Sequence, residues 1–180
     1  MSSLDFQDRT FLVFGVANKR SVAFRITQRL LEDGATVVCA VHTPARVEMV
    51  KKLLPTCDVF ACDLERDDEV AGLTAAVRKK HAKLNGIVHS VAFANYENFS
   101  GKFHEVSRKD FLQCVSVSCY SLTAVANAFK ELLDRRASVV TISISTTGMA
   151  AESYGFMAPA KAALDSSLVF LAKSFSRFSE

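Results

Sequence analysis

The stretch Thr10-Phe-Leu-Val-Phe-Gly-Val-Ala-Asn-Lys-Arg-Ser-Val-Ala-Phe24 decides the fold of this chain. Its first five residues form a continuous apolar and β-branched run, which predicts a buried strand. A turn that begins at Gly15 follows, and from Ser21 onward apolar side chains recur at helical spacing. A strand that passes through a short turn into a helix is the first unit of a βα repeat.

The same alternation of strand and helix continues along the 180 residues. Strands are predicted at 10–14, 36–41, 58–61, 86–93 and 137–144, and helices at 21–33, 44–54, 67–80, 107–133 and 155–178. Continuous apolar strands predict a parallel sheet that is covered on both faces. We therefore expect one α/β dinucleotide-binding domain over residues 1–180. Its sheet is expected to be Rossmann-type and doubly wound, with strand order 3-2-1-4-5 and ligands at the strands' carboxyl ends.

The composition points to a soluble protein of the cytoplasm. The chain is 49% hydrophobic, yet its longest apolar runs have the length of strands, and its N-terminus lacks the layout of a signal peptide. The 22 basic and 19 acidic residues give a net charge of +3 without a dense basic tract, so we expect neither a nucleic-acid partner nor a membrane. Cysteines without metal-ligand spacing predict reduced thiols and no metal site: Cys39, Cys57, Cys62, Cys114 and Cys119.

The turn after the first strand is the predicted site of a pyrophosphate, because helix N-terminal amides and the helix dipole favour an anion there. Only Gly15 remains of the usual G-x-G-x-x-G pattern, so the plain dinucleotide motif is absent. Ser21 stands where a further glycine is common, and its hydroxyl can cap the helix and donate to a phosphate. A simple βα turn with a serine cap explains this segment equally well.

Two further strand ends fit the same ligand site. Asp63 follows the third strand, where its carboxylate can accept from an adenine amino group, and a helix cap is the alternative. The run His89-Ser-Val-Ala-Phe93 ends the fourth strand, and its small residues let backbone approach a ribose and pyrophosphate. His89 itself also fits a packed core histidine.

Tyr154 and Lys161 form the predicted chemical centre. They stand seven residues apart, which predicts one shared helical face and about 10 Å along the helix axis. Pro159 is compatible with this helix only if it begins close to Tyr154. A cation that favours the phenolate makes the phenol a better proton donor to a developing oxyanion, which indicates reduction of a carbonyl or conjugated carbonyl. Amphipathic patterning without chemistry is the alternative for this pair alone.

Four motifs together resemble one family, the NADH-dependent enoyl-acyl carrier protein reductases of the short-chain dehydrogenase superfamily. They are Gly-Val-Ala-Asn-Lys-Arg-Ser at 15–21, Cys-Asp at 62–63, Val-His-Ser-Val-Ala-Phe at 88–93, and Tyr154 followed by six residues and Lys161. Most of the superfamily places three residues between tyrosine and lysine, whereas this family places six and has a Gly-Val-Ala-x-x-x-Ser turn. The resemblance extends over about residues 6–175.

The resemblance implies a role for each site residue. Hydride would pass from NADH to the β-carbon of a trans-2-enoyl thioester carried by acyl carrier protein or coenzyme A, and Tyr154 would stabilise or protonate the enolate oxygen. Substrate contacts are implied for Phe93, Ile144, Tyr154 and Met157. The implied cofactor contacts are Gly15, Ala17, Ser21 and Val22 at the pyrophosphate, Asp63 and Leu64 at the adenine, and Ser90, Val91 and Ala92 at the nicotinamide ribose, with Lys161 on the ribose hydroxyls and His42 after the second strand.

Three departures from the family pattern are visible. Ile144 stands where the family usually has a second tyrosine, ten residues before the first, so either Ser145 or Thr146 substitutes or the acyl specificity differs. Ala92 stands at a position that is commonly glycine. The family continues for one or two more βα units, which carry its substrate-covering segment and last strand. We therefore expect Glu180 to lie inside a longer chain.

The choice between NADH and NADPH depends on the end of the second strand. That strand end carries no acidic residue to accept from a ribose 2′-hydroxyl. His42 stands where the family often has a neutral glutamine, which favours NADH. Arg46 follows closely and fits a 2′-phosphate, so NADPH remains open.

The resemblance also implies a homotetramer, assembled through the helices predicted at 107–133 and 155–178. Two other functions remain open. Ile144 is compatible with a ketone or aldehyde reductase of the same superfamily. Ala92, Ile144 and the missing last units of the family together are compatible with a protein that binds the nucleotide without turnover.

Overall fold

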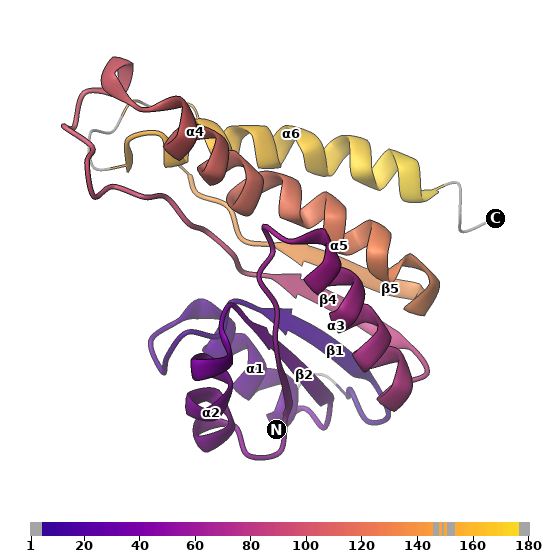
Figure 1. Ribbon diagram of the computed structural model, residues 1–180. Helices are drawn as coiled ribbons and strands as arrows, with labels where there is room; N and C mark the ends of the chain where they lie inside the picture. Colours follow the sequence, from indigo (N-terminus) through magenta and orange to yellow (C-terminus); the bar gives the residue numbers. More distant parts are fainter. Residues whose placement is uncertain (1–4, 146–147, 149, 151–153, 177–180) are drawn as a thin grey trace. The chain divides into compact units, whose positions relative to one another are not determined.

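Five strands form one parallel sheet in the computed structural model, which describes residues 5–145, 148, 150 and 154–176 (Figure 1). The strands are β1 (Thr10–Phe14), β2 (Thr36–Val41), β3 (Asp58–Ala61), β4 (Leu84–His89) and β5 (Leu133–Thr141). They lie in the order β3-β2-β1-β4-β5, and every neighbouring pair is parallel. The predicted doubly wound sheet is confirmed.

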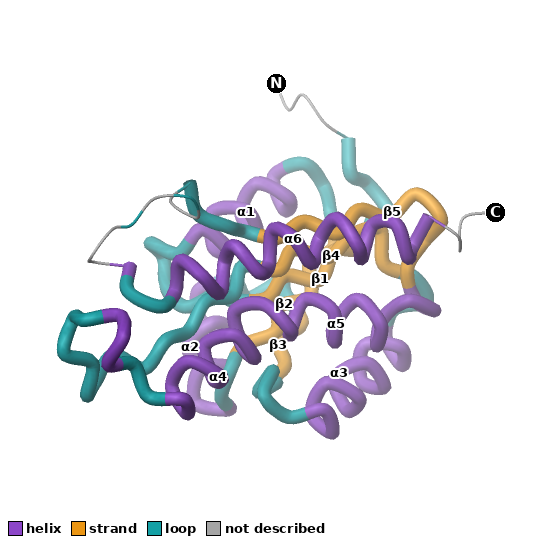
Figure 2. The backbone as a smooth tube through the Cα atoms, turned by 90° about the horizontal axis from the view of Figure 1, so that it is seen from above, coloured by secondary structure: helices purple, strands orange, loops and turns teal. Residues whose placement is uncertain are grey.

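The helices alternate with the strands along the chain (Figure 2). The α-helices are α1 (Val22–Glu32), α2 (Pro44–Leu53), α3 (Asp67–Lys80), α4 (Arg108–Val115), α5 (Ser121–Phe129) and α6 (Met157–Phe175). Three short elements complete them: the 3₁₀ turns η1 (Phe103–Glu105) and η3 (Lys130–Leu132), and the π-helical turn η2 (Ser116–Tyr120).

The chain groups into two compact units. The sheet unit comprises Met1–Ser90 and Ala126–Thr141, and it holds all five strands with α1, α2 and α3. The helical unit comprises Val91–Val125 and Ile142–Glu180, and it holds α4, η2 and α6. In this second unit α6 packs against both α4 and η2.

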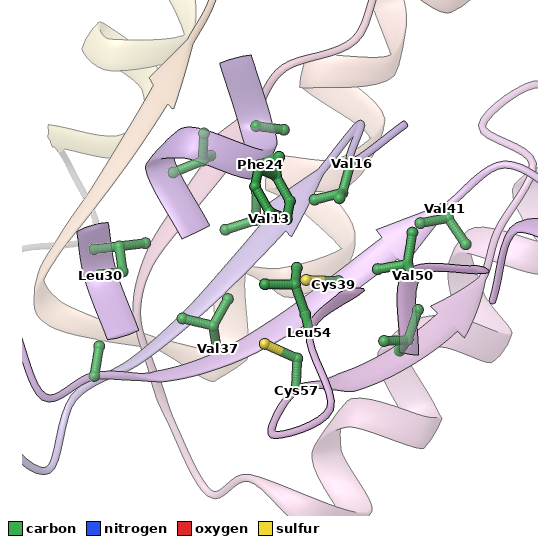
Figure 3. Packing of buried hydrophobic residues seen from close by; sticks show 14 residues of the cluster. Val13, Val16, Phe24, Leu30, Val37, Cys39, Val41, Val50, Leu54 and Cys57 are labelled. Carbon is green, nitrogen blue, oxygen red and sulfur yellow. The ribbon is translucent and has the colours of Figure 1, made fainter. Parts of the chain in front are cut away.

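The core of the sheet unit lies between one sheet face and the helices α1 and α2 (Figure 3). Phe24 and Leu30 of α1 and Val50 of α2 pack there on inward side chains of β1 and β2, including Val13 and Val37. The connection from β3 to β4 runs back across the sheet, so the right-handed crossover rule places α3 on the opposite face. All five cysteines are free thiols, as predicted, and all five are buried.

The last two strands end earlier than predicted. His89 pairs with Phe14, the last residue of β1, and Thr141 pairs with His89. Beyond these residues the described part of the chain offers no neighbouring strand, so the β-propensity of residues such as Val91 is not expressed as a strand. The chain therefore leaves the sheet at Ser90, which is the first of the three residues predicted to meet the nicotinamide ribose.

The predicted helix at 155–178 begins at Met157, because Gly155 adopts a φ of +48°. A left-handed residue interrupts helical geometry, so the prediction that Tyr154 and Lys161 share one helical face is wrong. Tyr154 lies before the helix rather than in its first turn. Pro159 falls at the third helical position, where its missing N–H leaves no intrahelical bond unmade, as predicted.

One continuous helical stretch, Arg108–Leu132, is long and apolar enough to cross a membrane by length and composition alone. The sequence predicted apolar runs of strand length only, whereas this helical stretch has 25 residues. A buried core helix passes the same test, and 39% of the most apolar window is buried. This stretch is therefore weak evidence for a membrane span.

Candidate active site

Gly15 is required by a close approach of two backbone segments in the sheet unit. It has a φ of +92°, and a Cβ atom placed on it would lie 1.9 Å from the carbonyl oxygen of Ser90. The chain that leaves β4 thus passes directly against the turn that leaves β1. Any larger residue at 15 would separate these two predicted cofactor-binding segments.

Ser21 caps α1, as predicted. Its Oγ accepts from the N–H groups of Phe24 and Ala17, both at 3.3 Å, and donates to the Asn18 carbonyl at 2.8 Å. The hydroxyl has a single proton. A phosphate that received a hydrogen bond from Ser21 would therefore replace Asn18 as its acceptor.

The N-terminus of α1 has the chemistry of an anion site. Its first turn carries no acidic side chain, and the amides of Val22 and Ala23 lie in the turn that has no intrahelical acceptors. Val22 is exposed, whereas Ala23 is buried in the core. Unpaired amides together with the positive end of the helix dipole fit a pyrophosphate.

The ends of β2 and β3 bring His42 and Asp63 together. Nε2 of His42 lies 3.6 Å from Oδ2 of Asp63. The other carboxylate oxygen of Asp63 accepts from the Glu65 N–H at 3.0 Å and so orders the turn in which half-buried Leu64 lies. The helix cap proposed as an alternative role for Asp63 is wrong, because Arg66 occupies the N-cap position of α3.

His89 is a core histidine. It is fully buried, and its Nδ1 lies 3.0 Å from Thr141 Oγ1, which links the ends of β4 and β5. This is the packing role weighed in the sequence analysis. It leaves the following residues, rather than the imidazole, as the candidates for cofactor contact.

Lys161 is a buried charged residue of the helical unit. Only 2% of the residue is exposed, and its Nζ donates to the carbonyls of Val91 at 2.9 Å and Ile142 at 2.8 Å. Burial lowers the pKa of Lys161 from its ordinary value, and the carboxylate of Asp165 opposes this shift. A buried ammonium with two backbone acceptors has one donor left for a ligand.

Tyr154 is held by its main chain. The Tyr154 carbonyl accepts a hydrogen bond of 2.8 Å from the Tyr96 hydroxyl. Tyr154 is 38% exposed. The Tyr96 ring packs on Phe156 at a centroid distance of 5.0 Å. A Cβ on Gly155 would lie 2.9 Å from the Phe99 ring, so the turn after Tyr154 is closely packed.

The remaining predicted substrate residues also lie in the helical unit. Phe93 is 43% exposed, and the preceding residue Ala92, which was predicted to contact the cofactor, is also exposed. Met157 packs against Cys114, with the two sulfur atoms 4.0 Å apart, and Ile144 is half-buried. Ser145 is exposed, whereas Thr146, the other proposed substitute for the second tyrosine, lies outside the described residues.

Two residues that hold the predicted site residues in place, Tyr96 and Ser118, were not predicted from the sequence. Tyr96 bonds the main chain of Tyr154, and Ser118 bonds the main chain of Phe93. Tyr96 lies in an irregular loop, where no periodic pattern marks a side chain as buried or bonded. Ser118 is fully buried in a helix. A serine on the apolar face of a predicted core helix was an available signal, because buried hydroxyls have hydrogen-bond partners.

The doubly wound sheet with a helix N-terminus free of acidic side chains after β1, and the buried lysine of the helical unit, are each features of the nucleotide-dependent oxidoreductases of the short-chain dehydrogenase class. Residues 15–178 match the family described as Enoyl-(Acyl carrier protein) reductase. That match covers most of the chain, so the chain belongs to this family.

Curated relatives agree with this assignment. The NADPH enoyl-acyl-carrier-protein reductase FabI of Staphylococcus aureus is 33% identical over 174 residues, which cover 94% of this chain and 68% of the relative. The NADH enzyme of Bacillus subtilis has the same identity and coverage.

Solved structures of the family have the same fold. The Bacillus cereus enzyme with NADP+ and an indole naphthyridinone superposes with a TM-score of 0.92 at 29% identity, over 96% of this chain and 69% of that one. The Aquifex aeolicus NADH enzyme gives a TM-score of 0.89 at 31% identity, over the same shares of the two chains.

Proposed function

We propose that the protein reduces the double bond of a trans-2-enoyl thioester in fatty acid synthesis, with NADH or NADPH as the hydride source. The enoyl group would be carried by acyl carrier protein or coenzyme A. The single observation that best supports this is Lys161, an almost fully buried ammonium fixed by two carbonyls and seven residues after Tyr154. Membership of the enoyl-acyl carrier protein reductase family indicates that Tyr154 and Lys161 serve in enoyl reduction.

The reaction divides between the cofactor and the chain. The nicotinamide, when bound, supplies the hydride that reaches the β-carbon of the enoyl thioester. Lys161 would donate its remaining N–H to the ribose hydroxyls and would add positive charge near the reacting groups. The hydroxyl of Tyr154 donates to the thioester oxygen as negative charge develops there, which stabilises the enolate.

The cofactor contacts are proposed on the sheet unit and the segment that follows it. The first turn of α1 with Gly15, Ala17, Ser21 and Val22 would hold the pyrophosphate, since it offers unpaired amides and no acidic side chain. Asp63 and Leu64 would hold the adenine, with His42 beside the adenosine ribose. Ser90, Val91 and Ala92 would line the nicotinamide ribose.

The proposal is tested with matched substrates. We would follow NADH and NADPH oxidation by the purified protein with a trans-2-enoyl thioester and with a 3-ketoacyl thioester of the same chain length. Enoyl reduction, identified by mass spectrometry of the saturated thioester, is the expected result. Turnover of the ketone alone would overturn it.

A ketone reductase is the second candidate, and Ile144 favours it. An aliphatic side chain cannot donate to a thioester carbonyl, so the second donor of the family pattern is missing at this position. If Ile144 instead selects among acyl chains, Ile144→Tyr changes the chain-length preference of enoyl reduction. If the protein reduces ketones, the same variant leaves enoyl turnover at background.

We further propose a single functional domain over residues 1–180 and a cytoplasmic homotetramer. Superposition of 96% of the chain on one family structure supports the single domain. Exposed apolar side chains on α6, Val169 at 68% and Phe170 at 76%, support assembly through that helix. Light scattering on Phe170→Glu tests this, because a charge in the interface would lower the mass of the assembly.

A further inference from the structure

A π-helical turn interrupts the long helix between α4 and α5. The turn η2 spans Ser116–Tyr120 and buries Ser118 and Cys119. Turns of this kind are rare, since their hydrogen bonds skip one more residue than those of an α-helix, and they occur frequently at functional sites. The question is what Ser118 does in its buried position.

The Ser118 hydroxyl bonds both polar main-chain groups of one residue. Its Oγ accepts from the Phe93 N–H at 2.9 Å and donates to the Phe93 carbonyl at 2.9 Å. Ser118 is completely buried. Phe93 lies 25 positions earlier and outside any strand, so sheet pairing does not fix its backbone.

The segment held in this way is fixed at a second point by Lys161. Two residues before Phe93, the carbonyl of Val91 accepts from Lys161 Nζ at 2.9 Å. On the helix, Cys114 Sγ lies 4.0 Å from Ser118 Oγ and 4.0 Å from Met157 Sδ. Ser118 thus contacts Phe93 directly, and it is linked to the start of α6 through Cys114.

We infer that Ser118 is a positioning residue of the reductase site. It holds residues 91–93 so that the Val91 carbonyl stays on the Lys161 ammonium and Phe93 stays available to the acyl chain. This inference rests on the proposed function, since it assigns the segment a place beside the nicotinamide and substrate. Ser118 makes both of these hydrogen bonds from within the π-helical turn η2.

The test compares Ser118→Ala and Ser118→Cys with Ser121→Ala. Cysteine has nearly the volume of serine but is a weak hydrogen-bond donor and acceptor. If Ser118→Ala fails to fold, Ser118→Cys therefore still tests the role of the hydroxyl. Ser121 is an equally buried serine of the same helix, and its hydroxyl donates to the Val117 carbonyl one turn earlier. It controls for the general effect of removing a buried hydroxyl.

Both Ser118 variants are expected to lose about tenfold or more in kcat/KM, the size of effect that misplaced binding groups produce. Their Kd for NADH rises, while their melting temperature falls no further than that of Ser121→Ala. The alkaline limb of kcat/KM also moves to lower pH, because a lost carbonyl acceptor disfavours protonated Lys161. Values of kcat/KM and Kd within twofold of the control in both variants would overturn the inference.

The failure of this inference is distinguishable from failure of the proposed function. If the unaltered protein binds NADH but reduces no enoyl thioester, the proposed function fails. Fluorescence titration with NADH then still tests whether Ser118 positions residues 91–93. An unchanged Kd for NADH in both Ser118 variants rejects that role.

Discussion

Lys161 illustrates how this fold keeps a charge in its interior. An ammonium that loses water needs replacement acceptors, and the carbonyls of Val91 and Ile142 supply them. Those carbonyls belong to the residues that follow β4 and β5 almost directly. Lys161 is therefore held by main-chain groups of its own unit, Val91 and Ile142.

The pH dependence of activity follows from this burial. Because burial lowers the pKa of Lys161, it loses its proton at a lower pH than an ordinary lysine, about 10.4. We expect kcat/KM to be full below the lowered pKa and to fall as pH rises through it. A profile that stays flat up to about the ordinary lysine pKa would contradict the role of Lys161.

The lowered pKa of Lys161 also makes the free energy of unfolding depend on pH. Between the lowered pKa and the ordinary one, the unfolded chain binds this proton more strongly than the folded protein does. The contribution of Lys161 to the free energy of unfolding therefore rises with pH in that window. Lys161→Met, which cannot titrate, is expected to remove this rise in urea denaturation measured at several alkaline pH values.

Tyr96 allows a second test at single-residue scale. Tyr96→Phe removes the 2.8 Å hydrogen bond to the Tyr154 carbonyl and keeps the ring that packs on Phe156. One such bond contributes about 1 kcal/mol, so kcat/KM should fall about threefold to tenfold. Tyr120→Phe is the control, because Tyr120 is 54% exposed. Equal activity of the two variants would show that the Tyr96 hydroxyl does not position Tyr154.

Among the elements, the turn from β1 to α1 depends most on one residue type. Gly15→Ala combines a positive φ with a Cβ placed 1.9 Å from the Ser90 carbonyl oxygen. We expect it to lower the free energy of unfolding by about 3 kcal/mol or more and to weaken NADH binding. Gly72→Ala, at an open position in α3, is expected to stabilise by about 0.5–1 kcal/mol. Thermal denaturation of both variants measures the difference, and equal losses would contradict the account of the turn.

The first turn of α2 contains Arg46, the residue predicted to influence the choice between NADH and NADPH. Arg46 is exposed in that turn, which has no acidic side chain. We expect Arg46→Gln to reduce kcat/KM for NADPH about tenfold, because a charged contact to the 2′-phosphate is lost. For NADH the value should remain within about twofold. An equal effect on both cofactors would place Arg46 away from the 2′-position.

At the scale of the whole molecule, the sequence predicted the sheet order and the identity of every strand. In β1, β2 and β4 burial on both faces leaves continuous apolar runs, and crossover rules leave few topologies for such strands. It did not predict the ends of β4 and β5, because the end of β1 at Phe14 determines them through pairing.

Other failures had tertiary causes. The break in the helix predicted at 107–133 accompanies the contact between Ser118 and Phe93, which are distant in sequence. The start of α6 depends on the φ of Gly155. Most candidate site residues were nevertheless named from sequence, since they follow strand ends or the Tyr154 and Lys161 motif. The residues that hold them, Tyr96 and Ser118, were not.

The most direct test of the central claim is NADH oxidation, measured as absorbance at 340 nm, with a trans-2-enoyl thioester for the unaltered protein and Tyr154→Phe. The account predicts turnover by the unaltered protein, a loss of about a hundredfold or more in kcat for Tyr154→Phe, and an unchanged Kd for NADH. Full enoyl turnover by Tyr154→Phe would contradict the assignment of the proton donor.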